Sequence, residues 1–441
     1  MRITHAEEVF EIESLTHDGR GVARPGGKAV FVHGALPGER VTAKRVRRHR
    51  NYDEAITLAV ERPSPERVTP HCPHFGVCGG CAMQHLATDA QLRAKERQLF
   101  DELERVGRVS AAERLEPLAA EPWGYRRRAR LGVKFVPKKG GVLVGFRESH
   151  SPLIAEIGEC PVLPPRVSAL LRPLASMIAG LSIHARLPQI EVAAADNALA
   201  LVLRVLDSPN DADRETLRAF AAEHRLEIYL QPGGLDSIEP LSAPAVTLHY
   251  VLREQNVTLS FAPTDFIQVN GPVNELLIAR TISELGPRAE DRLLDLYCGL
   301  GNFTLPLARR VASVAGVEGD AGLIARARAN AEANAIANAC FHVADLGEPL
   351  PDYEWARGRY DLVLLDPPRV GAETLIPQMA RWRPRRVVYV SCQPSSLARD
   401  AGILVHELGY SLSRAGIIDM FPHTAHVESM AVLDRTKRAE R

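Results

Sequence analysis

The chain has 441 residues, of which 46% are hydrophobic and 24% are charged, and its formal net charge is zero. The length indicates two to four domains, and the composition is that of a globular protein, which excludes disordered and fibrous classes. No apolar run reaches the roughly 18 residues that span a bilayer, so no membrane partner is expected. The acidic, amphipathic start MRITHAEEVFEIE is typical of neither a signal nor a transit peptide, so a cytoplasmic location is expected.

Residues 1–61 predict a small β-barrel of the OB kind. Strand-like stretches at 9–12, 29–32 and 39–43 are separated by glycine-rich turns. Closely spaced strands joined in this way are typical of that barrel, which often binds nucleic acid. Two basic blocks lie at 44–50 and 126–130. Either block alone is more typical of a solvated face, but two of them in a neutral chain favour a polyanionic partner.

Residues 62–264 predict a central α+β domain that begins with a cluster of cysteines. Cys72, Cys78 and Cys81 lie within ten residues, and Cys160 is a remote fourth among seven cysteines. An odd number of cysteines without a secretion signal argues against disulfides and for a metal site. Four thiolates suit either zinc or a [4Fe–4S] cluster. The uneven spacing, and the proline that follows Cys160, favour the iron–sulfur cluster.

A helix is predicted directly after the cysteine cluster. Thr88 is its expected N-cap, and apolar residues at 92, 99, 103 and 106 recur at helical spacing up to Gly107. From 115 to 261, strand-like and helical stretches are mixed in a way that does not define a strand order.

Residues 265–441 predict an α/β, Rossmann-like domain. Buried strands are expected at 292–296, 314–318, 360–366 and 386–391, and helices at 303–311 and 321–334. This alternation indicates a parallel sheet with helices on both faces. Open sheets of this kind bind their ligands at the carboxyl ends of the strands.

The turn after the first of these strands, DLYCGLGNF, predicts a cofactor site. Its glycines allow a ligand to approach the backbone, and Glu318 ends the next strand, where a carboxylate can bind ribose hydroxyls. The third glycine of a dinucleotide-binding turn is missing, so no pyrophosphate need be held. S-adenosylmethionine is therefore favoured over NAD, with Asp295 or its neighbours facing the cationic end and Asp345 as a further acidic residue, in the segment between the helix at 321–334 and the strand at 360–366.

Two further strand ends carry candidate chemistry. Asp366-Pro367-Pro368 forms a rigid lip after the strand expected at 360–366, and similar lips occur in amino-group methyltransferases. Cys392 lies in a polar Ser-Cys-Gln-Pro turn after the strand expected at 386–391. Because C5 of uracil is a poor nucleophile, a thiolate that adds to C6 can activate it for methylation, and a base must then remove the C5 proton. Glu428 is the candidate for that base.

Together these motifs resemble the RNA uracil-5-methyltransferase family. The resemblance covers the whole chain and rests on FIQVN at 266–270, LDLYCGLGNFTLPLA, DLVLLDPPR, VSCQPSSLARD and HVES. It implies a class I methyltransferase domain, an N-terminal TRAM barrel and an iron–sulfur cluster in the central domain. The barrel and cluster indicate the branch that acts on 23S ribosomal RNA, because the tRNA-directed relatives are expected to lack both.

The resemblance also implies roles for individual residues. Cys392 is the expected nucleophile and Glu428 the expected base, with a [4Fe–4S] cluster on Cys72, Cys78, Cys81 and Cys160. The expected S-adenosylmethionine-binding residues are Gln268, Tyr297, Asn302, Glu318, Asp345 and Asp366. The expected partner is RNA and not DNA, and a monomer is expected. Methylation of another RNA such as tRNA, a non-C5 RNA methyltransferase and a pure RNA-binding protein remain the alternatives.

Overall fold

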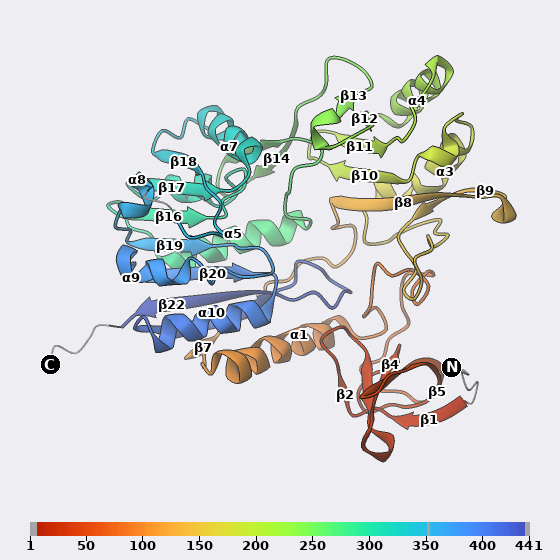
Figure 1. Cartoon of the computed structure of the whole chain (residues 1–441), viewed down its shortest axis with the longest axis horizontal. Coiled ribbons are helices and arrows are strands. Elements are labelled where there is room, and N and C mark those ends of the chain that lie inside the picture. The colour runs from red at the N-terminus through yellow and green to blue at the C-terminus, as the bar shows by residue number, and fades with distance from the viewer. Residues whose placement is uncertain (1–6, 351–352, 437–441) are drawn as a thin grey trace.

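The computed structural model describes residues 7–350 and 353–436, so the first six residues of the acidic N-terminal segment and the last five of the predicted catalytic domain lie outside it. Two six-stranded sheets, one eight-stranded sheet and one two-stranded hairpin make up the β structure of this part of the chain. In Figure 1 the eight-stranded sheet lies on the left, the N-terminal sheet at the lower right and the third sheet at the upper right.

The N-terminal sheet curls around a small core of its own, as expected of a barrel (Figure 1). Its strand order is β1-β5-β6-β4-β3-β2, and only the β4–β6 pair is parallel. The strands are β1 (Glu7–Glu11), β2 (Ser14–Leu15), β3 (Gly21–Ala23), β4 (Ala29–His33), β5 (Arg40–Arg48) and β6 (Tyr52–Arg62). Val30 and Val32, two residues apart on β4, are both fully buried. The three predicted strands are confirmed.

The central sheet has the order β13-β12-β11-β10-β8-β9. Its elements are β8 (Arg128–Val136), β9 (Gly141–Gly145), α2 (Pro165–Ser168), α3 (Leu171–Ala179), β10 (Gln189–Ala194), β11 (Leu199–Arg204), α4 (Asp211–His224), β12 (Glu227–Gln231) and β13 (Glu239–Pro240). The parallel pair β11–β12 is connected through α4, which begins at a capping box formed by Asn210 and Asp213. Helices α3 and α4 share one apolar core with this sheet.

The eight-stranded sheet has the order β18-β17-β16-β19-β20-β22-β21-β7. Its strands are β7 (Glu113–Arg114), β16 (Arg292–Leu296), β17 (Ser313–Glu318), β18 (Ala339–Val343), β19 (Leu362–Leu365), β20 (Arg386–Ser391), β21 (Tyr410–Ile418) and β22 (Glu428–Arg435). The first five strands of that order are parallel, and β22 runs antiparallel to β20 and β21. The predicted parallel sheet is therefore confirmed.

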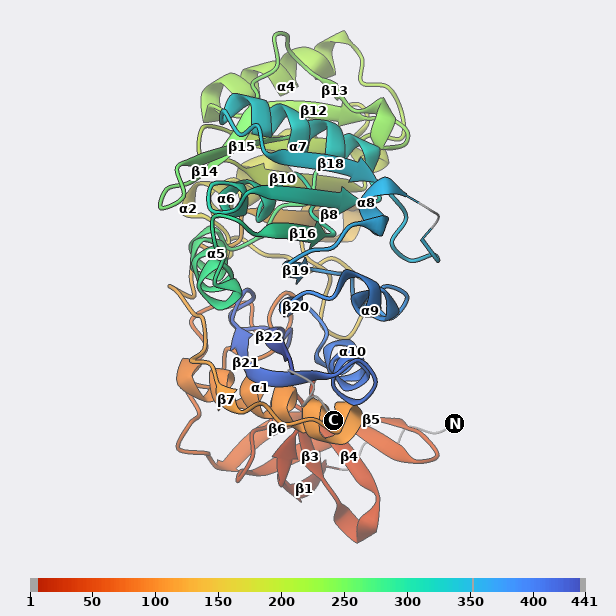
Figure 2. The same ribbon diagram turned by 90° about the vertical axis from the view of Figure 1, so that its left-hand side faces the viewer.

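Helices cover both faces of this sheet, as Figure 2 also shows. They are α5 (Gly271–Leu285), α6 (Thr304–Ala308), α7 (Ala321–Ala333), α8 (Glu354–Arg357), α9 (Met379–Trp382) and α10 (Pro394–His406). Successive residues of β16 point to opposite faces, so Leu293 joins the core under α5–α7 and Leu294 the core under α8–α10. The hairpin of β14 (Leu248–Leu252) and β15 (Val257–Phe261) packs against α7.

The stretch after the cysteine cluster packs against this large sheet. Helix α1 (Thr88–Glu102) continues as a π-helical turn over Leu103–Gly107 and contacts α10 and β21, and β7 pairs with β21. Gly107 is required there because a Cβ on it would lie 2.4 Å from the carbonyl oxygen of Ala398. No helix of the described ranges is long and apolar enough to cross a membrane.

Two details of the predicted helix are wrong. Thr88 is the first helical residue, and Ala87 occupies the N-cap position without a side-chain cap. The buried stripe of the helix also differs from the predicted apolar one. Val106 is 49% exposed, whereas the polar residues Gln91 and Lys95 are buried in line with Leu99. Packing against α10 and β21, rather than apolar character alone, decides which face is buried.

Candidate active site

Cys392 and Glu428 approach one another from neighbouring strands. Cys392 directly follows β20, and Glu428 is the first residue of β22, which pairs antiparallel with β20 so that Ser391 lies opposite Ser429. The Cys392 side chain is half-buried and lines a cavity of about 1490 Å³, whereas Glu428 is only 7% exposed. The structure thus brings these two predicted residues together at the edge of the sheet.

Burial and neighbouring charges hold protons on both groups. Burial raises the pKa of Glu428 to about 8, the charge of Asp366 raises it further, and Lys95 opposes the rise. Burial also raises the pKa of the Cys392 thiol, as do the charges of Glu428 and Asp366, while Arg369 lowers it. Because each negative charge raises the neighbouring pKa values, these acids resist being ionised together.

The carboxyl ends of β16, β17 and β19 gather acidic side chains. Asp295 is fully buried; Thr304 Oγ1 donates to its Oδ2 at 2.5 Å, and its Oδ1 has no partner in the described structure. Burial raises the pKa of Asp295 to about 7, helped by the charges of Asp366 and Glu318. Burial and Glu318 likewise raise the pKa of Asp366 to about 7. A buried group of carboxyls that raise one another's pKa suits a cationic ligand.

The turn after β16 is held in an unusual backbone conformation. Tyr297 has φ +64°, and Gly299 and Gly301 have φ +56° and +97°. No atom lies within 4 Å of a Cβ placed on Gly299, so the positive φ and not crowding explains the glycine there. Glu318 Oε2 accepts from the Gly299 N–H at 3.2 Å and its Oε1 from the Gly319 N–H at 2.7 Å. Glu318 therefore ties the turn to the end of β17.

The other predicted cofactor residues lie around this turn. Asp345 is exposed after β18, and its charge contributes to the raised pKa of Tyr297, about 12, for which burial is the main cause. Asn302 Oδ1 accepts from Asn274 Nδ2 at 3.0 Å and from the Tyr250 hydroxyl at 2.9 Å. Gln268 lines a small pocket together with Tyr250 and Asn274.

The lip after β19 is anchored to α10 and β20. The Tyr389 hydroxyl donates to Asp400 Oδ2 at 2.6 Å, and the Ala372 N–H donates to the same oxygen at 2.7 Å. The Ser396 hydroxyl donates to the Arg369 carbonyl oxygen. The backbone on which Asp366 and Arg369 sit is thus held from the helix that begins just after Cys392.

The four predicted metal ligands gather in one place. Cys160 is buried in the central core, and Cys78 and Cys81 pack against that core. Burial raises the pKa of Cys81 to about 12, and the charges of Cys160, Cys78 and Cys72 add to the rise, so the four thiols lie within electrostatic range. Within the described residues, however, no group of three or more His, Cys, Asp or Glu is arranged to hold a metal ion. The donor set therefore fits a thiolate-bound metal, but its ligand geometry is not formed.

The two basic blocks are largely neutralised by acids of the protein. Arg45 pairs with Glu8 and with Asp53. In the second block, Arg127 Nη2 lies 2.9 Å from Asp196, and Arg130 Nη2 lies 2.8 Å from Glu191. Arg128 also lies within 3.7 Å of Glu191. The expectation that both blocks face a polyanion therefore holds for few of their residues.

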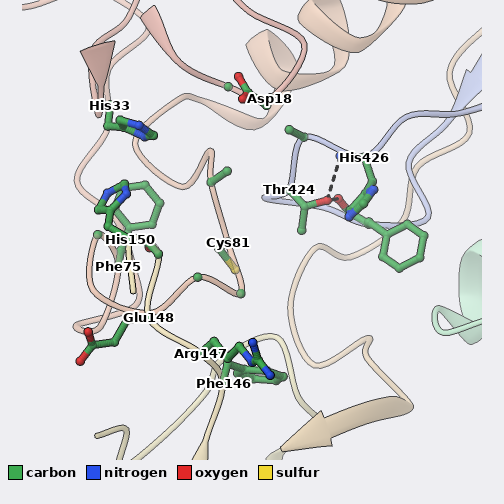
Figure 3. A pocket seen from close by; sticks show the side chains of 18 of the residues that line it. Asp18, His33, Phe75, Cys81, Phe146, Arg147, Glu148, His150, Thr424 and His426 are labelled. Carbon is green, nitrogen blue, oxygen red and sulfur yellow. Dashed lines mark hydrogen bonds between the residues drawn. The ribbon is translucent and has the colours of Figure 1, made fainter. Parts of the chain in front are cut away.

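A wide cleft of about 1490 Å³ separates the barrel from the catalytic edge. In Figure 3, His33 of the barrel faces His150, with ring centroids 4.4 Å apart, and His426 lies on the opposite wall. Lys134 and Arg147 also line the cleft and, in the described part of the chain, form no ion pair with a carboxylate. This volume exceeds that of ordinary small-molecule pockets, so the cleft suits a large anionic ligand.

The structure adds two residues that the motifs left without a role. Arg369 follows the Asp-Pro-Pro lip and lowers the pKa of Cys392, so its position beside a reactive thiol was a usable signal. Lys95 lies in the buried stripe of α1 and acts on Glu428, 333 positions later in the chain. No local pattern connects these two residues.

A parallel sheet with an acidic carboxyl edge, a glycine turn and an Asp-Pro-Pro lip defines an S-adenosylmethionine-dependent methyltransferase. The family model described as tRNA (Uracil-5-)-methyltransferase matches residues 241–436, and the TRAM domain model matches residues 10–56. The chain belongs to the RNA uracil-5-methyltransferase family, as its motifs predicted.

Relatives align along almost the whole chain. The 23S rRNA (uracil(1939)-C(5))-methyltransferase RlmD of Stenotrophomonas maltophilia is 51% identical and covers 98% of each chain. The enzyme of the same name from Alkalilimnicola ehrlichii is 51% identical over 97% of each chain. That of Methylococcus capsulatus is 49% identical over 96% of each chain.

One solved structure is similar over the same length. It is the tRNA (uracil-54, C5)-methyltransferase of Pyrococcus abyssi with S-adenosyl-L-homocysteine, with 26% identity, a TM-score of 0.73, and coverage of 97% of this chain and 100% of that chain. Such coverage includes the barrel. The expectation that tRNA-directed relatives lack a barrel is therefore wrong, and the barrel does not separate the two branches.

Proposed function

We propose that this chain transfers a methyl group from S-adenosylmethionine to C5 of a uridine in 23S ribosomal RNA. The 23S choice rests on relatives at about 50% identity, compared with 26% for the tRNA-directed structure. The observation that carries the chemistry is Cys392 beside the buried Glu428 at the end of a wide, cation-lined cleft. An amino-group methyltransferase has no use for that pair.

The proposed reaction begins at Cys392. Its thiolate forms a bond to C6, which makes C5 a nucleophile. S-adenosylmethionine, when bound, supplies an electrophilic methyl group on a sulfonium cation. Once C5 carries the methyl group, Glu428 accepts the C5 proton, the bond between Sγ and C6 breaks, and Cys392 leaves as a thiolate. Arg369 favours the thiolate form that both addition and elimination require.

The cofactor is assigned to the acidic edge. Asp366 and Asp295 suit the cationic end, and the unpartnered Asp295 Oδ1 supports this assignment. Glu318 and Asp345 are assigned to the polar groups of the nucleoside. Tyr297 in the turn is assigned to the same site. Gln268 and Asn302 complete the set on the far side of the turn, where Asn274 and Tyr250 orient Asn302.

A [4Fe–4S] cluster on Cys72, Cys78, Cys81 and Cys160 is part of the proposal. Its support is the donor set: four thiols from two segments, of which Cys160, Cys78 and Cys81 lie in or against one apolar core and Cys72 acts electrostatically on Cys81. Such a cluster supplies a structural link between the 72–81 loop and the central domain, since the reaction has no redox step. The proposal also divides the chain into domains at 1–61, 62–264 and 265–441. It names RNA and not DNA as the partner, and it includes a monomeric state and a cytoplasmic location.

The test of the chemistry is covalent trapping. RNA that carries 5-fluorouridine has no C5 proton to lose, so an enzyme that adds Cys392 to C6 stays attached to it. We expect a denaturation-resistant adduct with a 23S fragment and S-adenosylmethionine, and none with Cys392→Ala. Cys340→Ala, at an exposed cysteine outside the cofactor turn, is the matched thiol control. Failure of the wild-type protein to form an adduct would exclude C5 chemistry, and preferential trapping on tRNA would exclude the 23S choice.

The cluster is tested separately by iron and sulfide content. Protein prepared without oxygen should carry about four irons per chain, as a [4Fe–4S] cluster requires, and Cys81→Ser should lose them. Cys340→Ser, which changes an exposed cysteine, should keep them. Cys81→Ser should also unfold at lower temperature if the cluster is structural. Equal iron in both variants contradicts the assignment.

A further inference from the structure

The segment between β21 and β22 carries the proposed base and is held by helix α1. It runs from Asp419, just after β21, to Glu428, which starts β22 and pairs with Ile418. Gln91 and Lys95, one turn apart on α1, both reach it. The His423 N–H donates to Gln91 Oε1 at 3.0 Å, and Lys95 Nζ donates to the Phe421 carbonyl oxygen at 3.0 Å.

Lys95 is a costly residue at this position. Its side chain is 2% exposed, and Nζ lies 2.6 Å from Oδ1 of Asp419, itself 3% exposed. Withdrawing two such charges from water offsets most of their attraction, so apolar replacements of buried ion pairs are often neutral or stabilising. The stripe of α1 continues with the fully buried Leu99, which shows that an apolar residue suits this face of the helix. Stability alone therefore does not account for Lys95.

The position of Lys95 relative to Glu428 supplies another reason. Each charge acts on the other: Lys95 opposes the burial that raises the pKa of Glu428, and Glu428 partly offsets the burial that lowers the pKa of Lys95. Several other charged or titratable groups face Lys95, Glu428 or the segment between them. They are Asp366, Cys392, Arg369, Asp419, Tyr125, Arg126, His71, His423 and His426. Of these, Asp366 also acts on Glu428, and it works against the carboxylate form.

We infer that Lys95 is a positioning residue for the proposed base, because its ammonium group donates to Asp419 and to the Phe421 carbonyl oxygen, holds the segment that leads to Glu428, and acts electrostatically on the carboxyl group of that residue. The inference rests on the proposed function, since it assumes that Glu428 accepts the C5 proton. Lys95 touches neither the RNA base nor the cofactor in this assignment. Its effect is confined to the last step, in which the C5 proton leaves and the bond between Sγ and C6 breaks.

The experiment compares three Lys95 variants with a control on the same helix. Lys95→Met leaves Asp419 buried without a partner, so the decisive variant is Lys95→Met/Asp419→Asn, which removes both charges and keeps the fold. Lys95→Arg keeps the positive charge. Arg93→Met changes an exposed arginine of α1 that pairs with Glu66. Thermal melting establishes that each variant folds.

Two readouts separate the steps. With unmodified RNA, slow proton removal leaves the methylated RNA attached to Cys392, so the double variant should show an adduct that wild type and Arg93→Met do not accumulate. The pH at which product release is half-maximal should rise by about one unit in the double variant. Below that pH, the double variant should therefore release product about tenfold more slowly than wild type. Lys95→Arg should resemble wild type. The rate of trapping on 5-fluorouridine RNA, which does not need the base, should be unchanged.

The outcomes are distinguishable from failure of the proposed function. If wild type forms no adduct with 5-fluorouridine RNA, the proposed function is wrong. If wild type is trapped but the folded double variant releases product with the wild-type pH profile and accumulates no adduct, Lys95 is a structural residue and the inference is overturned. Adduct accumulation in Arg93→Met as well would also overturn it, because the effect would then not depend on the buried charge.

Discussion

Glu428 occupies a position in which its burial serves its proposed role. A carboxyl group with a raised pKa holds a proton more tightly once it has accepted it, so it is a stronger base than an exposed glutamate. The same burial keeps part of the population protonated near neutral pH, when the group is not a base. Asp366 pushes the pKa of Glu428 up and Lys95 pulls it down, so the balance of these neighbours sets the working pH.

A pH profile follows from this balance. The base acts only when it is deprotonated, and its pKa is about 8, so product release should fall about tenfold for each unit of pH below 8 and level off above it. Glu428→Gln should abolish this dependence of product release on pH and leave methylated RNA attached to Cys392. Release of labelled product from unmodified RNA, measured between pH 6 and 9.5, checks it. A flat profile in the wild-type protein would show that another step limits release.

At the scale of elements, the catalytic edge depends on how the lip is anchored. The lip follows β19, the proposed nucleophile Cys392 follows β20, and α10 holds the lip through Asp400 and Ser396. Tyr389 on β20 reaches across to Asp400, and the Ala372 N–H donates to both side chains. This network connects two strand ends that must keep a fixed separation if the cofactor beside Asp366 is to reach the base that Cys392 attacks.

Tyr389→Phe tests the anchor. Loss of the hydroxyl removes a buried hydrogen bond, which should lower the free energy of unfolding by about 1–3 kcal/mol, and the loosened lip should lower the methylation rate roughly tenfold. Tyr410→Phe is the matched control, because Tyr410 is also buried and its hydroxyl donates to the Pro384 carbonyl oxygen at 3.0 Å, away from the lip. Denaturant unfolding and single-turnover methylation measure both effects. A similar loss of rate in the two variants would mean that stability, and not the lip, is responsible.

At the scale of the whole molecule, residues of the barrel, the cysteine loop and the central domain, such as His33, Cys81 and Phe146, line one cleft (Figure 3). Cys392 lines the same cleft. The arrangement is held in part by a small apolar cluster in which Leu36 of the barrel packs with Met83, Leu86 and Ala90. A long polyanion can therefore contact the barrel and the catalytic edge together. Contacts to its phosphates add affinity without reading sequence.

Lys134→Ala and Arg147→Ala should both weaken RNA binding. Each substitution removes a cation of the cleft that has no carboxylate partner among the described residues. If that cation contacts one phosphate, the slope of log K against log salt concentration should become less steep by roughly 0.9. Binding of S-adenosylmethionine should not change. Arg218→Ala, which changes an exposed arginine of α4 outside the cleft, is the control. RNA titrations at several salt concentrations measure the slopes, and equal slopes in all variants would place the RNA elsewhere.

The sequence by itself determined the barrel, the parallel sheet and the residues at its carboxyl edge. Strand periodicity, glycine turns and strand-end acids are local patterns, and parallel strands necessarily bring their carboxyl ends to one side. For this reason Asp295, Glu318, Asp366 and Cys392 could be expected to meet before any coordinates were known. Family motifs added Glu428, which no local pattern marks.

Only the tertiary structure decided which basic side chains remain free of acidic partners and can contact RNA. Most arginines of the second basic block are paired with acids such as Glu191, which is about 60 residues away in the sequence, so block composition misjudged the surface that faces RNA. The buried face of α1 was likewise set by its packing on α10, which places Lys95 beside Glu428. Pairing and burial depend on contacts between distant segments, and a sequence pattern records only what is near along the chain.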